Sequence, residues 1–457
     1  MRAEQGVIEL QETQANPRKA GDFMRPRKPP IEADRQGDMF KTPLEDIIDM
    51  KHELVRLAGF IPWDDFDRQF GSLYQPDRGR PAAPTRLPAG LHYLKEAFNL
   101  SDERTIKVWT ENPYWQYFCG MKFFSHEVPI DPSQMTKWRK RVGEAGVEKM
   151  LAGTVHAARG MKMLRAGSFD KVNVDTTVQE KAAHYPTDAR LYHDMRKKLV
   201  RMAEENGVAL RQSYARLGKE ALFQAGRYAH ARQMKRAKKR IKKLKTYLGR
   251  VVRDIRRKTE GDERKQAVFC EALTLADRLL SQKRGDSKKL YSVHAPEVEC
   301  IAKGKAHKKY EFGVKVSVAA TSREGFVIGM CALPGNPYDG HTLAASIEQV
   351  EKIIGRELSG DVFVDRGYRG HDYAGRAAVH IVGRIKRSAR DAIEKWKRRR
   401  AAVEPEIGHL KNDGRLGRNY LKGTLGDKLN AVLCGCGQNI RKLLAFLFRP
   451  PAPMCRA

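Results

Sequence analysis

The spacing of hydrophobic residues divides the chain into helical and strand-like regions. Over residues 42–160 the apolar residues recur at helical intervals, as in LEDIIDMKHELVRLAGF, where they fall on one broad side. Alternation begins at residues 168–178, where Val172, Val174 and Val178 are separated by polar residues, as in a half-buried strand. We therefore expect a helical N-terminal region followed by a sheet.

The helical pattern returns after this strand and continues over residues 187–284. Its clearest part, residues 234–258, repeats an apolar residue at steps of four, three, four, three and four. That repeat is the a/d seam of a coiled coil or a helical hairpin, and it leaves open whether the seam pairs two chains or packs within one. The seam consists of Ala237, Ile241, Leu244, Leu248, Val251 and Ile255.

Strand patterns reappear at residues 309–320 and 325–334, joined by a short polar segment with a glycine that suits a hairpin. An amphipathic helix at 341–358, two short apolar strands and basic helices after Ser388 complete the order. A meander of strands followed by alternating strands and helices predicts a mixed α/β sheet flanked by helices. The long helical insertion follows the first strand.

The net charge of the chain indicates the kind of partner that it binds. The 457 residues include 87 Lys and Arg against 55 Asp and Glu, a formal net charge of +32. This excess favours a polyanionic partner, most simply nucleic acid, over a basic protein that binds none. Residues 234–258 carry thirteen Lys and Arg with Asp254 as the single acid. Like charges repel along a helix and a polyanion relieves them, although a solvated face is the simpler alternative. The candidate DNA contacts there are Lys235, Lys239, Lys242 and Lys243.

The N-terminal region ends in a basic helix that Asp131 can cap, with Pro132 at its first position. Several short helices ending in a basic one can form a DNA-binding unit of the helix-turn-helix kind. A helical domain with ordinary solvated charges fits the pattern equally well. The candidate DNA contacts of this region are Lys137, Arg139, Lys140 and Arg141.

Cysteine content and the terminal sequence indicate the compartment. The seven cysteines include no CxxC pair, which suits free thiols in a reducing cytosol. The N-terminus lacks the apolar segment of a signal peptide, and we count no apolar run as long as a membrane span. The sequence thus predicts a cytoplasmic protein that does not enter a membrane.

Two strands present an aspartate in matching apolar frames, Val-Asn-Val before Asp175 and Val-Phe-Val before Asp365. One such aspartate is most simply the cap of a strand end. Two in matching frames, on strands that can be neighbours in one sheet, bring two repelling carboxylates to the same edge. A divalent cation is their natural partner there.

A third acid is expected from the basic segment RRRAAVEPEIGHLKN, which offers Glu404 and Glu406. Two positions apart, they lie roughly 200° apart around a helix and cannot both face one site. Glu404 stands near a helix N-terminus, in line with Arg400 one turn before it and Lys411 seven residues after it. The acid suits a metal and the two cations suit a phosphate, which leaves Glu406 to solvent or to a supporting role.

Asp175 in VNVDTTVQ, Asp365 in VFVDRGYRG and Glu404 in RRRAAVEPEIGHLK resemble the DDE triad of bacterial insertion-sequence transposases. The similarity is greatest to the group named after insertion sequence five, whose catalytic core is RNase H-like. The resemblance runs from about residue 44 to residue 447 and includes HAPEVECIAKGKAHKKYEFGVKVSV.

The family motif around the last acid is Tyr-x2-Arg-x3-Glu-x6-Lys. Arg400, Glu404 and Lys411 match its last three members. The tyrosine position is Lys397 here, with Trp396 beside it as a substitute, so the role of that tyrosine is unassigned.

The resemblance implies that the three acids bind two Mg²⁺ ions, with Mn²⁺ as a substitute, for phosphodiester hydrolysis and strand transfer. The implied partner is double-stranded DNA, both element ends and target, bound by a homodimer at the nucleoid. A structure-selective metal nuclease and a non-catalytic domesticated DNA-binding protein are the alternatives. The residues expected to support the acids are Thr176, His341, Arg366 and Tyr368. For His341, a surface histidine at the start of a helix fits the sequence equally well.

These patterns predict a division of the chain into domains. A disordered leader precedes a helical DNA-binding domain, and an RNase H-like catalytic domain is interrupted by a basic helical insertion before a short tail. The respective ranges are 1–41, 42–160, 161–186 with 291–447, 187–290, and 448–457.

Overall fold

A computed structural model gives the fold of the chain. It describes residues 23–24, 41–74, 80–283, 285–287, 289–302, 308–383 and 392–448. The predicted leader and tail therefore lie almost wholly outside the described residues. The chain forms two compact units, residues 1–165 with 439–457 and residues 166–438.

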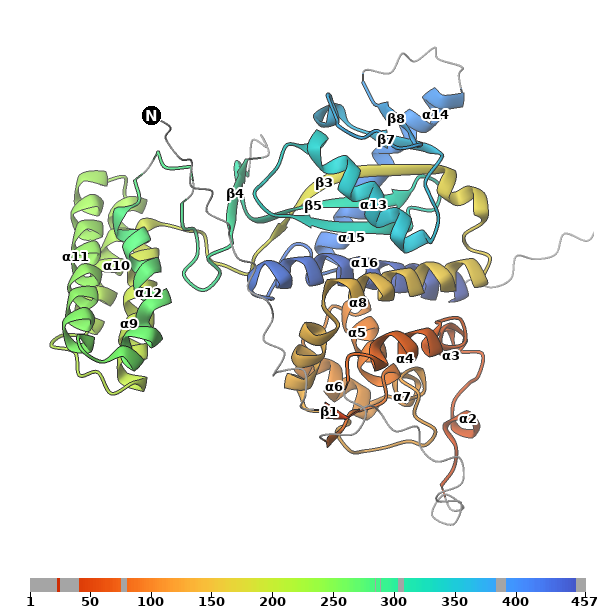
Figure 1. Ribbon diagram of the computed structural model, residues 1–457, viewed down its shortest axis with the longest axis horizontal. Helices are drawn as coiled ribbons and strands as arrows, with labels where there is room; N and C mark the ends of the chain where they lie inside the picture. The colour runs from red at the N-terminus through yellow and green to blue at the C-terminus, as the bar shows by residue number, and fades with distance from the viewer. Residues whose placement is uncertain are drawn as a thin grey trace, which may run out of the picture. The chain divides into compact units, whose positions relative to one another are not determined.

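The first unit is built from short helices and one long one (Figure 1). The helices are α2 (Leu44–Ile47), α3 (Glu53–Ala58), α4 (Trp63–Gly71), α5 (Arg86–Ala97), α6 (Asp102–Glu111), α7 (Pro113–Phe118) and α8 (Pro132–Gly160). Two-residue strands, β1 (Phe23–Met24) and β2 (Arg80–Pro81), pair in parallel. Strand β1 lies in the leader that the sequence predicts to be disordered, and β2 lies in the region that it predicts to be all-helical.

Aromatic side chains fill the core of this unit. Tyr93 and Trp109 are among its largest fully buried side chains. Helix α8 begins as its sequence predicts, because the Asp131 carboxylate accepts a hydrogen bond of 2.8 Å from the Ser133 amide. Gly143 has a φ of 61° inside α8 and kinks it, a conformation that favours glycine.

The last helix, α16 (Gly423–Phe448), crosses the boundary between the units. Its residues from Asn439 onward belong to the first unit, whereas the sequence placed them in the catalytic domain. Arg441 donates hydrogen bonds to the carbonyls of Glu96 and Ala97, at 3.1 and 3.2 Å. These contacts join residues about 345 positions apart, which local sequence patterns do not report.

Helix α16 is also the one described helix that is long and apolar enough to cross a membrane by length and composition. The sequence reading had not counted it as such a span. Of its most apolar 18-residue window, 67% is buried inside the fold, the burial expected of a core helix.

The second unit contains a six-stranded mixed sheet. Its strands are β3 (Lys171–Glu180), β4 (Glu299–Ala302), β5 (Tyr310–Thr321), β6 (Val327–Leu333), β7 (Asp361–Val364) and β8 (Ala378–Ile381). Strand β5 pairs antiparallel with β3, β4 and β6, while β7 pairs parallel with both β3 and β8. The predicted mixed α/β sheet is confirmed, and β3 lies at its centre.

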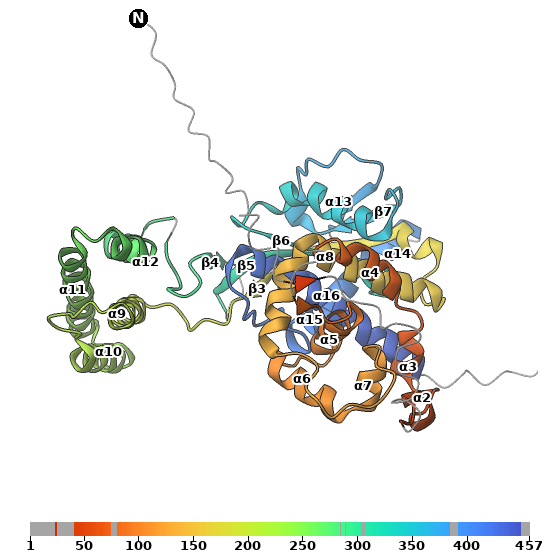
Figure 2. The same cartoon turned by 60° about the horizontal axis from the view of Figure 1, so that its bottom comes forward.

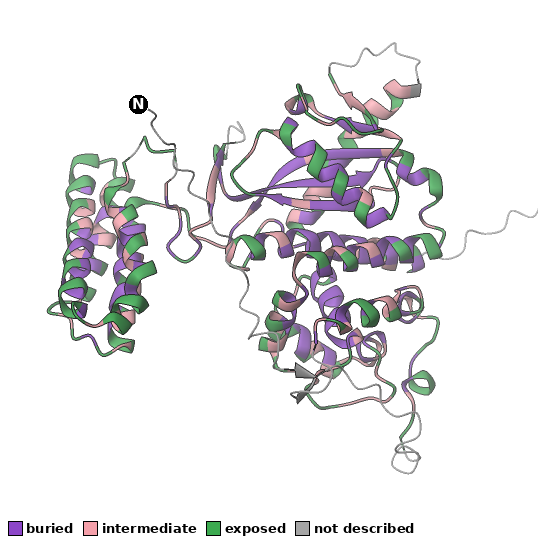
Figure 3. Cartoon of the chain, viewed as in Figure 1, coloured by how far each residue is buried: buried purple, intermediate pink, exposed green. Residues whose placement is uncertain are grey.

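Burial on both faces of β3 corrects the prediction of a half-buried strand. Asn173 and Gln179 are as fully buried as the valines between them, and Figure 3 shows the central strands buried. Helix α13 (Leu343–Ile354) packs on one face of the sheet, where Ser346 donates to Ser317. On the other face, Asn430 of α16 donates to Gln179. The polar residues of β3 are thus buried with hydrogen-bond partners rather than solvated.

Four helices form the predicted insertion after β3. They are α9 (Asp188–Glu205), α10 (Ala215–His230), α11 (Met234–Thr259) and α12 (Glu263–Ser281), all labelled in Figure 2. The seam of α11 packs within the chain, because Leu244, Leu248 and Ile255 are buried in one core with residues of α9, α10 and α12. This packing answers the question that the heptad pattern left open.

Candidate active site

Strand pairing brings the two aspartates to the same level of the sheet. Strands β3 and β7 are parallel neighbours, with Lys171 opposite Asp361 and Asn173 opposite Phe363. The constant offset of 190 residues places Asp365, directly after β7, at the level of Asp175. The matching frames of the sequence thus correspond to adjacent strands.

Backbone amides orient one oxygen of each aspartate. Asp175 Oδ1 accepts the amide of Thr176 at 2.8 Å. Asp365 Oδ1 accepts the amide of Gly367 at 2.8 Å and caps the 3₁₀ turn η4 (Arg366–Tyr368). Asp365 therefore is the strand-end cap of the simpler interpretation, and its second oxygen still faces the site described next.

Glu404 enters from a helix that packs on β3. It is the second residue of α15 (Val403–Asn412), whose first turn also contains Pro405. Val403 and Leu410 are buried and fix the helix, while the Glu404 side chain remains 69% exposed. The acid is thus held on a packed helix with its carboxylate accessible.

Arg400 lies among all three carboxylates. Its Nη2 is 2.7 Å from Asp175 Oδ2 and 3.8 Å from Asp365 Oδ2, and its Nη1 is 3.8 Å from Glu404 Oε1. The side chains of Arg400 and Asp175 are 14% and 15% exposed. The sequence assigned Arg400 to phosphate, and the structure instead places it as the counter-ion of the acids. One guanidinium against three carboxylates leaves a formal charge of −2.

A hydrogen-bond network fixes the segment that carries Arg400. The neighbouring Arg399 donates to the carbonyls of Ser322 and Arg323, both at 2.7 Å. Ser322 in turn donates its hydroxyl to Asn173 of β3 at 2.7 Å. The short turn η5 (Arg400–Ala402) is thus tied to the β5–β6 hairpin and to the strand of Asp175.

A fourth acid near the triad was missed by the sequence analysis. Asp339 begins the 3₁₀ turn η3 (Asp339–Thr342) after β6. Its Oδ1 accepts hydrogen bonds from Thr176 Oγ1 at 3.1 Å and Lys315 Nζ at 3.0 Å. The signal in the sequence is the segment GNPYDGHTL, in which Asp339 stands two residues before His341.

Tyr368 lies fully buried beside these acids. Burial raises the pKa of its hydroxyl far above the usual value, and the carboxylates of Asp175, Asp339 and Asp365 raise the pKa further. Among the described residues the hydroxyl has no hydrogen-bond partner. The Ser317 hydroxyl close to it is engaged by Ser346.

The other residues predicted to support the acids differ in burial and in contacts. Thr176 is buried and binds Asp339, as described. His341 is exposed and stacks edge-on against Tyr338, with ring centroids 5.5 Å apart. Arg366 is exposed.

The remaining members of the C-terminal motif have local partners. Lys411 Nζ lies 3.6 Å from Oε1 of the buried Glu311, so the structure pairs it with an acid where the sequence predicted a phosphate contact. Lys397, at the family's tyrosine position, pairs with Glu394 at 2.7 Å. Trp396 receives the Lys171 ammonium 5.3 Å from its ring centroid.

Divalent ions match the donors at this site. Carboxylate oxygens are the ligands that Mg²⁺ and Mn²⁺ prefer, and the uncompensated negative charge favours a cation. Within the described part of the chain, however, no three His, Cys, Asp or Glu side chains converge closely enough to hold an ion by themselves. The acids instead surround Arg400, which occupies the space between them.

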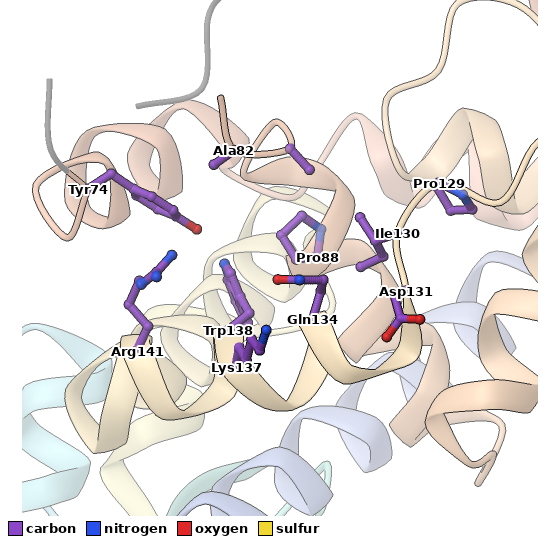
Figure 4. Close-up of a pocket in the computed structure, with 11 residues that line it drawn as sticks. Tyr74, Ala82, Pro88, Pro129, Ile130, Asp131, Gln134, Lys137, Trp138 and Arg141 are labelled. Atoms are coloured by element: carbon purple, nitrogen blue, oxygen red, sulfur yellow. The ribbon is translucent and has the colours of Figure 1, made fainter. Parts of the chain in front are cut away.

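The predicted DNA contacts of the first unit fall into two environments. Lys137 and Arg141 line a hollow of about 350 Å³ together with Trp138 and Tyr74 (Figure 4). The Arg141 guanidinium lies over the Tyr74 ring, 4.8 Å from its centroid. The two aromatic side chains are buried, whereas Lys137 is exposed and Arg141 is half-buried, so the basic groups are the accessible part of this hollow.

The structure corrects the prediction that Arg139 contacts DNA. Its side chain is only 3% exposed and makes two hydrogen bonds to Asp102, of 2.9 and 2.7 Å. It faces the core because its helical position lies on the opposite side from Lys137 and Lys140, which are both exposed.

Helix α11 of the insertion presents its basic residues to solvent. The four lysines singled out in the sequence are exposed, whereas the cations of the last turn contact acids: Arg256 pairs with Asp277, and Arg257 with Asp254 at 2.6 Å. Among the described residues no ion pair joins the four lysines to an acid. The four are Lys235, Lys239, Lys242 and Lys243.

Comparison with known proteins adds a family relationship to this geometry. The family model "Transposase domain (DUF772)" matches residues 42–141, and "Transposase DDE domain" matches residues 286–439. "Uncharacterized protein ORF8 in nfe locus" of Rhizobium meliloti is 53% identical over 210 residues, which are 46% of this chain and all of that protein. No solved structure matches. The second match contains Asp365 and Glu404, whereas Asp175 lies outside both.

Proposed function

Because this chain belongs to the family of insertion-sequence DDE transposases, we propose that it binds the terminal inverted repeats of an insertion sequence, cuts the DNA at the element ends and joins the 3′-OH ends to target DNA. The mixed sheet is the RNase H-like core of this family. The observation that carries the proposal is the convergence of Asp175, Asp365 and Glu404 on Arg400, within 3.8 Å.

In the proposed mechanism Asp175, Asp365 and Glu404 would hold two Mg²⁺ ions, which Mn²⁺ could replace. When bound, such ions activate a water or a 3′-OH as nucleophile and stabilise the leaving oxygen. The rigid strands hold Asp175 and Asp365, and the exposed Glu404 closes the site from α15. Arg400 is then released from the carboxylates and is placed to bind the reacting phosphate.

DNA reaches this site through basic surfaces elsewhere on the chain. Lys137, Lys140 and Arg141 of α8 are proposed to bind the element ends, and the lysines of α11 to bind the DNA backbone. Since both ends of an element must be paired, the active species is proposed to be a homodimer. It acts in the cytoplasm, where its DNA substrate lies.

A strand-transfer assay tests the function. Labelled element ends and a target plasmid are incubated with the full chain and Mg²⁺, and cleaved and joined products are separated on a gel. Asp175→Asn, Asp365→Asn and Glu404→Gln should each abolish both products. The matched control is Glu406→Gln, since Glu406 lies two residues from Glu404 but accepts a hydrogen bond from Gln438 at 3.0 Å.

The assay separates the proposal from its alternatives. Cleavage without joining by the native chain indicates a nuclease, and binding without cleavage indicates a non-catalytic DNA-binding protein. Joining that survives Asp175→Asn shows that the acid outside the family match is not part of the triad.

A further inference from the structure

Asp339 is tied to two strands of the sheet by its side chain. Its Oδ1 accepts the hydroxyl of Thr176, the residue directly after Asp175, and the ammonium of Lys315 in β5. Lys315 is mostly buried and also donates to the carbonyl of Pro337 at 2.6 Å. Thr176 and Lys315 are both buried, so their hydrogen bonds hold Oδ1 of Asp339 in place. The position of Oδ1 in turn sets the position of Oδ2.

The free oxygen of Asp339 faces Asp365 across a glycine. A methyl group on Gly367 would stand 3.0 Å from Asp339 Oδ2 and 3.0 Å from Asp365 Oδ1. Because both oxygens lie 3.0 Å from that one position, they are at most twice this distance apart. Two carboxylates at this separation repel, and a cation between them relieves the repulsion.

The buried hydroxyl of Tyr368 supplies an independent indication. It is enclosed, has no hydrogen-bond partner among the described residues, and lies in the field of three carboxylates, those of Asp175, Asp339 and Asp365. A buried polar group without a partner is costly and marks a place where a ligand or water completes the hydrogen bonding.

The count of formal charges also indicates a cation at this site. Arg400 and Lys315 bring two positive charges to the four carboxylates of Asp175, Asp339, Asp365 and Glu404. The surplus of two negative charges favours cation binding even while Arg400 is still in place. Asp339 thus adds a fourth carboxylate, close to Asp365, to this surplus of negative charge.

We infer that Asp339 is a fourth carboxylate of the same divalent-cation site, oriented by Thr176 and Lys315 and facing Asp365 across Gly367. This inference rests on the proposed function, since it assigns a further ligand to the cation site of that reaction. The competing role is structural, in which Asp339 only neutralises the buried Lys315.

Titration of the full, DNA-free chain with Mn²⁺, followed by electron paramagnetic resonance, measures cation binding without activity. Asp339→Asn should weaken binding about 10- to 100-fold. The control is Asp372→Asn, because Asp372 is an exposed acid close in sequence to Asp365 and should leave binding unchanged. Asp365→Asn serves as the positive control and should weaken binding at least as much as Asp339→Asn.

The double variant Lys315→Met with Asp339→Asn separates the two roles. Binding should stay weak in the double variant if the carboxylate itself holds the cation, and recovery to the native affinity would assign Asp339 to Lys315 alone. Where thermal melting shows that Asp339→Asn does not fold, Thr176→Val decides instead. That variant keeps the carboxylate, removes its orienting hydroxyl and should also weaken Mn²⁺ binding.

The controls also separate this inference from the proposed function. If Asp365→Asn loses Mn²⁺ and Asp339→Asn binds as the native chain does, the inference is wrong and the triad stands. If the native chain binds no Mn²⁺, or Asp365→Asn binds it fully, the cation site of the proposed function is itself wrong.

Discussion

Arg400 competes with divalent cations for the same three carboxylates, and Arg400→Gln tests this competition. In the DNA-free chain the guanidinium must leave Asp175 before a cation can bind there, since the two groups are 2.7 Å apart. Glutamine keeps a polar side chain but is shorter and carries no charge. The variant should therefore bind divalent cations more tightly than the native protein.

The magnitude follows from burial and distance. The contact to Asp175 joins two groups that are about 15% exposed, and such a charge-assisted hydrogen bond contributes about 1.5–3 kcal/mol. The contacts to Asp365 and Glu404 are 3.8 Å long, and those carboxylates are 41% and 69% exposed. Solvent screening leaves them about 0–1 kcal/mol together. Together the contacts contribute about 1.5–4 kcal/mol, so at about 1.4 kcal/mol per decade the affinity should rise about 10- to 700-fold.

Isothermal titration calorimetry with Mn²⁺ on the DNA-free chain gives the affinity. Thermal melting with EDTA and then with Mg²⁺ gives a second readout. The variant should melt at a lower temperature with EDTA, because three carboxylates have lost their counter-ion, and should gain more from Mg²⁺. The matched control is Lys395→Gln, which removes one positive charge from an exposed position on the preceding helix α14 (Ala392–Arg399).

An unchanged or lower Mn²⁺ affinity in Arg400→Gln would refute the reasoning. It would mean that Arg400 does not occupy the cation site in solution. An equal rise in Lys395→Gln would assign the effect to net charge rather than to the contact with Asp175.

Two further predictions concern the helical parts of the chain. Asp102→Asn leaves the buried Arg139 and Lys95 without their acid and should lower the free energy of unfolding, measured with urea, by about 3–5 kcal/mol. Burial acts to raise the pKa of Asp102, but the hydrogen bonds from Arg139 and the charge of Lys95 hold it well below the usual value. The difference in free energy of unfolding between the native chain and Asp102→Asn is therefore complete above the ordinary carboxyl pKa of about 4. It is lost as the pH falls toward the lower pKa of Asp102 in the folded chain. A difference that persists at the lowest pH would contradict this. Replacing the four exposed lysines of α11 by glutamine should weaken DNA binding and reduce the slope of log affinity against log salt by up to about 3.6, and an unchanged slope would show that α11 does not contact DNA. Those lysines are Lys235, Lys239, Lys242 and Lys243.

The sequence by itself determined the helices and strands and the apolar residues that flank the two aspartates. The alternation around Asp175, the cap at Asp131 and the heptad seam of α11 are local patterns, and local backbone and side-chain preferences suffice to produce them. The matching frames of Asp175 and Asp365 also indicated neighbouring strands. A parallel pairing with a fixed offset then places the acids at one level.

Only the tertiary structure decided which polar residues meet. Arg400 contacts an acid 225 residues away, and Asp339 meets Thr176 across 163 residues. Burial on both faces of β3 and the inward position of Arg139 likewise depend on which helices cover each surface. Such contacts follow from packing between distant segments, because a hydrogen bond depends on separation in space and leaves no periodic trace along the chain.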